Sequence, residues 1–518
     1  MKKSIALALF ALSTIGNYAQ DIPTTIAKSD IFKDEYKFSQ IADVTQDGNG
    51  GVLVSRTYRG GFFSGGAGGY YFEHYDAKLK LIKEYEYEMK YSEFEKQSSV
   101  LGMITNGDEI HLIDFLYNRD EKAYICSALT ANINDFNFKK TELFRLSSDE
   151  IKQFSFFASS AFDNDSGASM ILNEDKNAFA ITVDIKDKST ETHKLFLFDN
   201  KLNKKIEHIF VRDIKDRKFV YENIDVSNDG NTLYLLGKVY TDEKKSKKDG
   251  GKYQFELTRV TKDSQKTQVF DTEEHYSRSL KTIVLEGRLT CVGFYSDRND
   301  NRYKGISYFE LDPETLAIRK TKFNPFTEQF MIDKYGKDKD KELKNLSFRK
   351  ILITPTHEIV FNAEEFYIVT SYVSTPNGSY TTTTYHYDDI VTAKINTSGD
   401  IAWARNINKR QATAGESSYL SYTSTIKGND TYFFINAGEK VKKLSNDRIQ
   451  FGQTSTKHSN LNVIRVNENG DFDYKEILDD KDNEVPFMVA YGAIMTSEHS
   501  VFFMGRKGKK KQLLKVTL

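Results

Sequence analysis

The sequence predicts an all-β fold, a β-propeller of eight four-stranded blades whose last blade is closed by an N-terminal strand. Three observations predict it: a hairpin pattern that repeats along the chain, an apolar strand before most of these hairpins, and an abundance of Tyr (30) and Phe (37). Aromatic residues favour strands. Residues 1–19 are predicted to be a signal peptide and residues 20–518 one propeller domain. The alternatives are seven blades with a peripheral hairpin, or two separate all-β domains.

The first element is the signal peptide. Lys2 and Lys3 precede an apolar run over 5–15, and small residues then lead to Ala19. The run is too short for a membrane-spanning helix, which needs about 20 residues. We therefore expect cleavage after Ala19 and export to the periplasm, the cell surface or the medium of a Gram-negative bacterium. A retained membrane anchor is the alternative, and no later segment is apolar for long enough to be a transmembrane helix.

The repeating element is a strand, a polar turn and a second strand. The turns contain Asp, Asn, Gly and Pro, which tolerate or preset turn dihedral angles. The six steps from the turn at Asp76 to the turn at Asn467 span 391 residues, a mean of about 65. The hairpins are predicted at 71–87, 194–210, 254–270, 306–323, 389–407 and 462–477, with a weaker copy at 123–144.

A second hairpin precedes each of these, and its second strand is nearly all apolar. A strand that is apolar on both faces is covered on both sides. Four strands per repeat, with the inner pair most buried, is the pattern of a propeller blade. These apolar strands are predicted at 51–54, 109–115, 178–183, 232–236, 358–361, 431–435 and 500–504.

The last repeat has only three strands, near 488–495, 500–504 and 512–518. The stretch 31–38 is strand-like and precedes the first full blade. Its pairing with the last blade would close the ring and remove two free sheet edges, which otherwise promote unwanted pairing.

The loops on the two faces of the predicted ring differ in length. One face has short turns, whereas the other has long loops at 59–69, 241–251, 327–345, 374–384 and 438–460. Long loops on a rigid scaffold commonly form binding sites, although insertions are also tolerated there without a role. Aromatic residues and Arg dominate binding hot spots. The candidate contacts are therefore Tyr58, Arg59, Phe62, Phe63, Tyr380 and Tyr385.

The charge pattern excludes one class of partner. The formal net charge is −1, and the loss of two lysines with residues 1–19 changes it to −3. Nucleic-acid binding depends on clustered positive charge. We expect no nucleic-acid partner.

Few residues have the spacing of a metal or redox site. Cys126 and Cys291 lie in apolar strand-like runs and are interpreted as buried inert thiols, with a disulfide between them as the alternative in an oxidising compartment. The histidines lack zinc-site spacing. Asp163, Asp165 and Glu174 partly match a calcium loop, but the fifth and sixth positions do not, so an ordinary turn is the competing interpretation. No cofactor is expected.

An enzymatic role is left undecided. Glu364 and Glu365 follow the apolar strand at 358–361, and one of them would face the central channel. A glycosidase needs two carboxylates at a defined separation, and no partner is identifiable by spacing. A carbohydrate-active hydrolase or lyase with a carboxylate in the channel is therefore the alternative function.

Two resemblances support the fold. Residues 227–234, Ser-Asn-Asp-Gly-Asn-Thr-Leu-Tyr, resemble a hairpin of TolB-like propellers. The stretches 342–346 (Glu-Leu-Lys-Asn-Leu), 362–367 (Asn-Ala-Glu-Glu-Phe-Tyr), 387–403 (beginning Tyr-Asp-Asp-Ile-Val) and 408–411 (Asn-Lys-Arg-Gln) resemble a family of uncharacterised secreted proteins of Bacteroidetes-type bacteria. That resemblance implies an exported propeller and brings no activity or catalytic residues.

The sequence therefore predicts an exported propeller that acts as a binding scaffold. Its expected partner is a protein or glycan of the cell envelope, recognised through the long loops on one face. The ligand, the oligomeric state and the exact compartment are left open.

Overall fold

The computed structural model describes residues 22–47, 50–59, 68–89, 99–151, 168–185, 190–214, 218–241, 252–270, 275–297, 302–375, 378–446, 448–453, 455 and 457–518. Strands make up most of this part of the chain. Its only α-helix is α1 (Glu328–Tyr335). The all-β prediction is confirmed.

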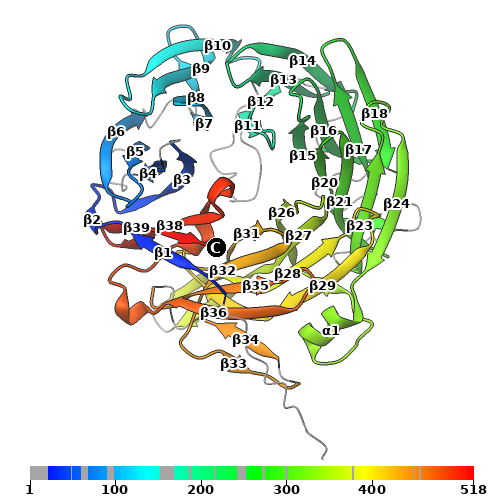
Figure 1. Cartoon of the computed structure of the whole chain (residues 1–518). Coiled ribbons are helices and arrows are strands. Elements are labelled where there is room, and N and C mark those ends of the chain that lie inside the picture. The colour runs from blue at the N-terminus through cyan, green and yellow to red at the C-terminus, as the bar shows by residue number, and fades with distance from the viewer. Residues whose placement is uncertain are drawn as a thin grey trace, which may run out of the picture.

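The strands form mostly antiparallel sheets that follow one another around a common centre (Figure 1). In chain order the first four sheets are β3–β6 (Phe38–Gln46, Val52–Arg59, Gly68–Tyr75, Leu81–Met89), β7–β10 (Ser99–Asn106, Glu109–Asn118, Ala123–Asn132, Lys139–Ser147), β11–β14 (Ala168–Leu172, Ala178–Ile185, Glu191–Asp199, Lys204–Arg212) and β15–β18 (Phe219–Val226, Leu233–Tyr240, Tyr253–Val260, Gln265–Phe270).

The next two sheets carry additional strands. One contains β19 (Tyr276–Ser277), β20 (Lys281–Leu285), β21 (Arg288–Ser296), β23 (Gly305–Leu311) and β24 (Ile318–Pro325). The other contains β26 (Leu346–Ile353), β27 (Ile359–Thr375), β28 (Gly378–Ile395) and β29 (Ile401–Ile407), extended by β30 (Lys409–Thr413), β34 (Ile449–Gly452) and β33 (Lys442–Lys443). A separate pair joins β22 (Arg302–Tyr303) to β25 (Leu343–Lys344).

The last two sheets complete the arrangement. They are β31 (Thr423–Lys427), β32 (Asp430–Ala437), β35 (Asn460–Val466) and β36 (Phe472–Leu478), then β37 (Ala493–Met495), β38 (Ser500–Lys507), β39 (Lys510–Thr517), β1 (Thr25–Lys28) and β2 (Phe32–Lys33). Successive antiparallel sheets around one centre are a β-propeller, as predicted. Eight blades remains a prediction, for which the described residues provide eight sheets of four or more strands.

The predicted turn residues fix the outer hairpins in the same way. The side chain of Asp76 accepts hydrogen bonds from the backbone N–H groups of Lys78 and Lys80, both at 2.9 Å. Asp199, Asn396 and Asn467 accept the same two bonds from the residues two and four positions later. These bonds hold the turn before the strand resumes.

The two ends of the described chain are joined in one sheet. β1 pairs with β39 from Thr25 opposite Thr517 to Lys28 opposite Leu514. The prediction of an N-terminal closing strand is confirmed, but its position is corrected. The main closing strand is β1, and the predicted stretch 31–38 contributes only β2 before it enters β3.

A buried ion pair ties the segment between β2 and β3 to the first sheet. The Asp34 carboxylate lies 2.7 Å from the Arg56 guanidinium of β4, and both side chains are only 2% exposed. Arg56 also pairs with Glu73 of β5. β2 ends where it reaches Lys510, the first residue of β39, and the Asp34 N–H donates to the oxygen of Lys509 just beyond it.

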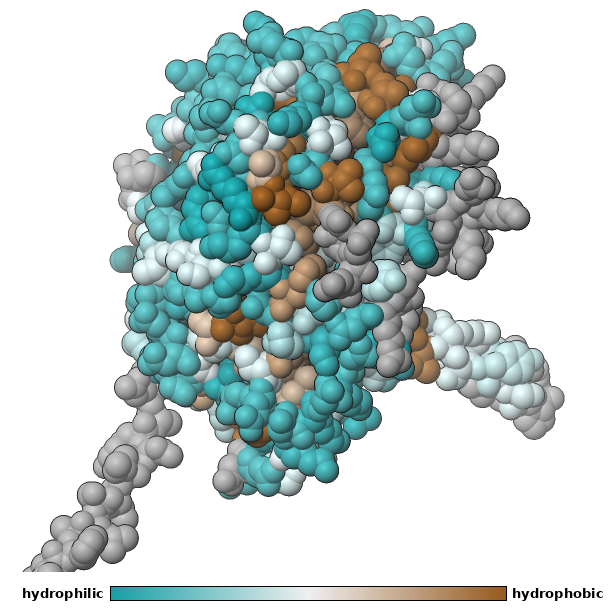
Figure 2. All heavy atoms as spheres, turned by 90° about the vertical axis from the view of Figure 1, so that its right-hand side faces the viewer, coloured by the Kyte–Doolittle hydropathy of each residue, from teal (hydrophilic) through white to brown (hydrophobic). Residues whose placement is uncertain are grey.

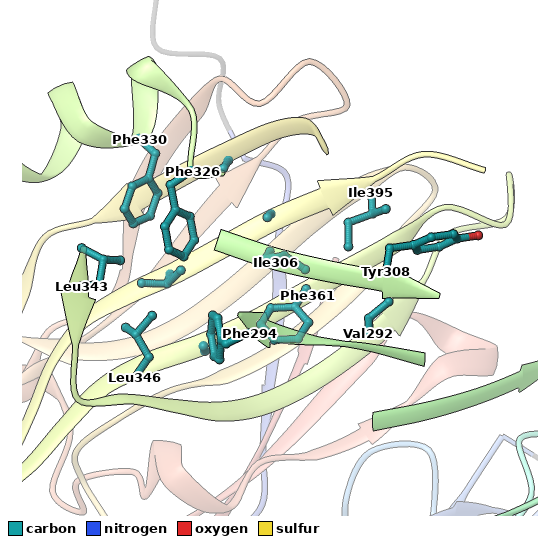
Figure 3. Packing of buried hydrophobic residues seen from close by; sticks show 14 of the residues in the cluster. Val292, Phe294, Ile306, Tyr308, Phe326, Phe330, Leu343, Leu346, Phe361 and Ile395 are labelled. Carbon is teal, nitrogen blue, oxygen red and sulfur yellow. The ribbon is translucent and has the colours of Figure 1, made fainter. Parts of the chain in front are cut away.

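The hydrophobic core lies between neighbouring sheets. Figure 3 shows the layer between β21–β23 and β27–β28, where the rings of Phe294 and Phe361 meet edge to face at a centroid distance of 4.9 Å. Phe330 of α1 is fully buried and stacks on Phe326 in the same layer. Thr327 caps the start of α1, because its hydroxyl accepts a hydrogen bond from the N–H of Phe330. The helix lies within the predicted long loop 327–345.

Cys126 and Cys291 are buried, as predicted, and both thiols are free. Burial raises the pKa of Cys291 to about 12 and also raises the pKa of Cys126. The structure contains no disulfide between Cys126 and Cys291, so that alternative is wrong. Both residues belong to the core.

One predicted long loop is corrected. Most of 374–384 is strand, because β27 runs to Thr375 and β28 begins at Gly378. The Thr, Tyr and Val residues of this stretch favour extended backbone, and the two strands pair in continuous register.

Candidate functional site

The strands β27 and β28 continue beyond their sheet as a two-stranded ribbon, which we define as residues 366–375 and 378–387. The neighbouring strand β26 pairs with β27 only as far as Glu365, and β30 pairs with β28 only at Tyr385–Tyr387. Beyond these points the two strands pair only with each other within the described residues. Figure 2 shows an arm of mostly pale spheres that projects from the body, which fits the Thr, Ser and Tyr residues of the ribbon.

The ribbon presents large side chains to solvent without any charge. No Asp, Glu, Lys or Arg occurs from residue 366 to residue 387, although 28% of the chain is charged. The most exposed large side chains are Tyr372 (73%) and Tyr380 (56%), followed by Ile368 and Val369. The predicted contact Tyr380 therefore lies on an accessible surface.

The other predicted contact residues have varied positions. Tyr385 is half-buried at the base of the ribbon, opposite Ile368. Tyr58 is buried, stacks on Tyr36 at 4.3 Å and donates a hydrogen bond of 2.6 Å to Glu86. Strand β4 continues past Tyr58 to Arg59. Tyr58 is therefore a core residue and not an accessible loop contact.

The other three predicted contacts lie wholly or partly outside the described residues. Arg59 ends β4, and its side chain lies outside the described part of the structure. Phe62 and Phe63 also lie outside the described residues. The ribbon is therefore the portion of the long-loop face that the structure defines best.

Glu364, the first enzyme candidate, lies at the base of the ribbon in a buried ion cluster. Its carboxylate is fully buried and lies 2.8 Å from the Lys409 ammonium. Arg349 donates from Nε to Oε2 at 2.9 Å, and the Ser421 hydroxyl donates to the same oxygen at 2.8 Å. These contacts hold the carboxylate in place, and none of them is the second carboxylate that a glycosidase requires.

The partner lysine, Lys409, also makes several hydrogen bonds. The Lys409 ammonium also donates to the backbone oxygen of Tyr387 at 2.6 Å and to Gln411 at 3.1 Å. Burial lowers the pKa of Lys409, and the neighbouring Glu364 offsets part of this effect. The Glu364 carboxylate and the Lys409 ammonium therefore both have several partners, as buried charged groups require.

Glu365 contacts a different cation. A β-bulge at Glu365 separates the register on either side, and its carboxylate lies 2.8 Å from Lys334 of α1. Lys334 also lies 2.6 Å from Asp389. Burial opposes the charge of Lys334, but Asp389 and Glu365 outweigh it, so that its pKa lies above the usual value. The two glutamates therefore act in two separate ion clusters.

A cavity of about 330 Å³ lies beside the Glu364 cluster, and we call it the inner cavity. It lies between β26, β31 and β37, each at one end of its sheet, and extends to Tyr387 at the ribbon base. Figure 1 places β26 and β31 toward the centre of the ring. The lining includes Arg349, Lys350, Tyr387, Ser421, Ser424 and Tyr491.

A β-bulge brings two cations to this wall. In the pairing of β26 with β27, Phe348 is opposite Ala363 and Lys350 is opposite Asn362, so Arg349 is the additional residue. Bulges redirect side chains and are common beside active sites. Both Arg349 and Lys350 line the inner cavity as a result.

The two cations differ in their partners. Arg349 is paired with Glu364, whereas no hydrogen bond or ion pair holds the Lys350 ammonium within the described structure. Burial lowers the pKa of Lys350 to about 8. The buried Ser424 hydroxyl on the facing strand β31 also has no hydrogen-bond partner among the described residues.

The predicted calcium candidates do not form a defined site. Glu174 lies in the turn between β11 and β12, where burial and the neighbouring Asp175 raise its pKa. Asp163 and Asp165 lie outside the described residues. Within the described ranges, no group of three or more His, Cys, Asp or Glu side chains could hold a metal ion.

The inner cavity was missed from the sequence, because its lining comes from segments that are far apart. Lys409 is 45 residues from Glu364, and Ser421 is 57 residues from it. One signal was present: the consecutive cations Arg349 and Lys350 interrupt a strand that is otherwise largely apolar. Two charged neighbours in a buried strand indicate a bulge or an unusual partner.

No helix within the described ranges has the length and apolar character needed to cross a membrane.

No protein family and no curated protein matches the sequence. Among solved structures, an acylaminoacyl peptidase of Pyrococcus horikoshii is 10% identical with a TM-score of 0.37, over 79% of this chain and 49% of that chain. The chain thus spans about half the length of that protein.

Two further solved structures are similar at the same level. The β-propeller domain of the Trilobed protease from Pyrococcus furiosus is 9% identical with a TM-score of 0.33, over 74% of this chain and 97% of that one. The polysaccharide lyase Uly1 is 10% identical with a TM-score of 0.36, over 92% and 89%. At these scores the likenesses carry no argument about activity.

Proposed function

We propose that this chain is an exported propeller that acts as a binding scaffold and recognises a partner protein through the ribbon on its long-loop face. The observation that carries the proposal is the uncharged, exposed ribbon with Tyr372 and Tyr380 as its most exposed large side chains. Tyrosines are enriched at binding hot spots, and charged residues are depleted at interface cores.

The backbone of the ribbon supports the same proposal. From Tyr367 to Val373, β27 pairs on one side only, with β28. Exposed strand edges present unpaired N–H and C=O groups that another extended segment can pair with. Addition of a partner strand would use these groups, and the adjacent side chains would provide specificity.

The alternative ligand is a glycan, which tyrosine rings can also bind by stacking. The alternative function, a carbohydrate-active hydrolase or lyase that uses Glu364 or Glu365, is less well supported. Glu364 pairs with Lys409 and Arg349, and Glu365 pairs with Lys334. Neither carboxylate is free to act as the acid of a pair.

The test is a shortened ribbon. Residues 370–383 are replaced by Asn-Gly, which forms a tight hairpin turn between the paired residues Val369 and Thr384. The full-length and shortened proteins are each incubated with envelope extract and cross-linked, and the same proteins are applied to a glycan array. We expect one or more envelope proteins to be captured by the full ribbon and lost with the shortened one.

A matched control is Tyr474→Ser on β36. Tyr474 is 40% exposed, so this change removes an accessible tyrosine elsewhere on the molecule. Capture should be retained in this variant. Equal capture by the full and shortened ribbons would contradict the proposal, and ribbon-dependent binding to glycans without protein capture would replace it with glycan recognition.

A further inference from the structure

The inner cavity contains polar groups whose positions no contact within the protein explains. Lys350 lines the cavity without an ion-pair partner in the described structure. Ser424 lines the same cavity, and its buried hydroxyl has no hydrogen bond there. Buried polar groups are normally paired, and those that are not indicate a ligand, a water molecule or a functional role.

The charges around the cavity do not balance. The cations are Arg349 and Lys350 on the wall and Lys409 behind it. The acids are Glu364, which is shared by Arg349 and Lys409, and Asp388, whose charge acts on Lys409. Three cations and two carboxylates leave one positive charge, and Lys350 is the cation without a partner.

The rest of the lining offers hydroxyl groups rather than charge. Ser417 and Ser424 contribute hydroxyls, and Tyr387, Tyr422 and Tyr491 contribute phenol rings. The volume of about 330 Å³ lies near the lower end of small-molecule sites, which span roughly 300–1,000 Å³. These features fit a ligand of about the size of one sugar unit.

We propose that the inner cavity binds the carboxylate of a hydroxylated ligand of the sugar-acid class, with Lys350 as its ion-pair partner and Ser424 as a hydrogen-bonding partner. One unpaired ammonium matches a monoanion better than a doubly charged phosphate. Arg349 is already held by Glu364, so it shapes the wall while Lys350 makes the new contact. The two proposed contacts, Lys350 and Ser424, lie outside the ribbon, so this proposal does not depend on the partner proposed above.

The first test is isothermal titration calorimetry of the full chain with D-glucuronate and D-glucose. These probes share a ring and differ only in a carboxylate in place of a hydroxymethyl group. We expect glucuronate to bind and glucose to bind at least about tenfold more weakly, the difference expected for one charge-assisted hydrogen bond. Inorganic phosphate is the third probe and should bind more weakly than glucuronate.

Variants assign the binding to the cavity. Lys350→Met should weaken glucuronate binding about tenfold or more, and Lys350→Arg should restore much of it. The matched control is Lys281→Met on β20, because Lys281 lies near the Glu222 backbone oxygen and does not line the cavity. Ser424→Ala should give a smaller loss. Circular dichroism and thermal unfolding establish that each variant is folded.

The pH dependence provides an independent readout. Burial lowers the pKa of Lys350 to about 8, and the charged ammonium is the binding form. Glucuronate affinity should therefore be highest near neutral pH and fall as the pH rises above about 8. The other ionisable side chains in the cavity lining are Arg349, Tyr387, Tyr422 and Tyr491. Lys350→Met should remove the fall in affinity.

Three results would overturn the proposal. They are equal binding of glucuronate and glucose, undiminished glucuronate binding by a folded Lys350→Met, and the absence of any glucuronate binding. Tighter binding of phosphate than of glucuronate would also overturn the assignment to a carboxylate. Loss of ribbon-dependent capture alone would leave this result unaffected.

Discussion

The strands β27 and β28 have an inner half and an outer half that contrast sharply. In the inner half, Val360, Phe361 and Val391 are fully buried between neighbouring sheets. In the outer half, Val369 and Tyr372 of the same strand are exposed. The bulge at Glu365 separates the two halves. One hairpin therefore contributes core packing at one end and an accessible surface at the other.

The largest expected effect is at the boundary, from Glu364→Gln. This change leaves the fully buried Lys409 without its carboxylate, and breaking a buried ion pair costs about 3–5 kcal/mol of unfolding free energy. Glu365→Gln is the control and should cost less than about 1 kcal/mol, because Lys334 keeps Asp389. Urea unfolding at neutral pH measures both. A loss of less than about 1 kcal/mol from Glu364→Gln would mean that the Glu364 cluster adds little to stability.

The second prediction compares the same substitution in the two halves. Val360→Ala removes two buried methyl groups and should lower the unfolding free energy by about 2–3 kcal/mol. Val369→Ala, where the side chain is 41% exposed, should change it by less than about 0.5 kcal/mol. Urea denaturation measures the pair. A similar loss of unfolding free energy at both positions would show that the ribbon is packed in solution, and the two halves would then not differ in burial.

The third prediction concerns Lys350, which pairs across from Asn362 of the inner half. The folded-state pKa of Lys350, about 8, lies below the usual lysine value of 10.5, so the unfolded chain binds its proton more strongly. Below pH 8 the buried charge destabilises the fold, and Lys350→Met should raise the unfolding free energy by about 1–3 kcal/mol. Because the charge is lost first in the folded state, this difference should shrink as the pH rises from 8 toward 10.5.

Urea unfolding of the two proteins at a series of pH values tests this sign. Lys281→Met provides the comparison for a lysine outside the cavity. A Lys350→Met variant that is less stable than the unmodified protein at neutral pH would show that Lys350 has a structural partner.

The smallest expected effect is in the outer half. The double change Tyr372→Ser and Tyr380→Ser should alter the unfolding free energy by less than about 0.5 kcal/mol, because both rings are mostly in solvent. Differential scanning calorimetry measures the midpoint. A large fall would indicate that these rings pack against the body and are not available to a partner.

The sequence predicted the inner half well and the outer half poorly. The apolar run that ends at Phe361 indicates a covered strand, and the structure buries it completely. The outer half was predicted to be a loop because Pro376, Asn377 and Gly378 occur together. In the structure β27 instead continues to Thr375 and β28 begins at Gly378, and the two strands pair over this whole described length. Local turn chemistry was recognised, but the length of the strands around it was not.

The candidate site illustrates a different limit. Glu364 was identified as unusual because two acids follow an apolar strand, yet its partners Lys409 and Ser421 depend on pairing between distant strands. Three of the four stretches that carry the resemblance to the secreted family, those around Glu364, Tyr387 and Lys409, meet in this one cluster. Periodicity identifies the strands, whereas the charges that meet between sheets follow from tertiary packing.

The pairing of β1 with β39 has a consequence for how the molecule is made. Thr25 meets Thr517, so the sheet that contains β1 cannot be completed on a nascent chain until residues near the far end have been synthesised. Until then β1 has no partner strand, and unpaired strands of this kind are prone to aggregation. Ring closure is therefore expected to be a late folding step.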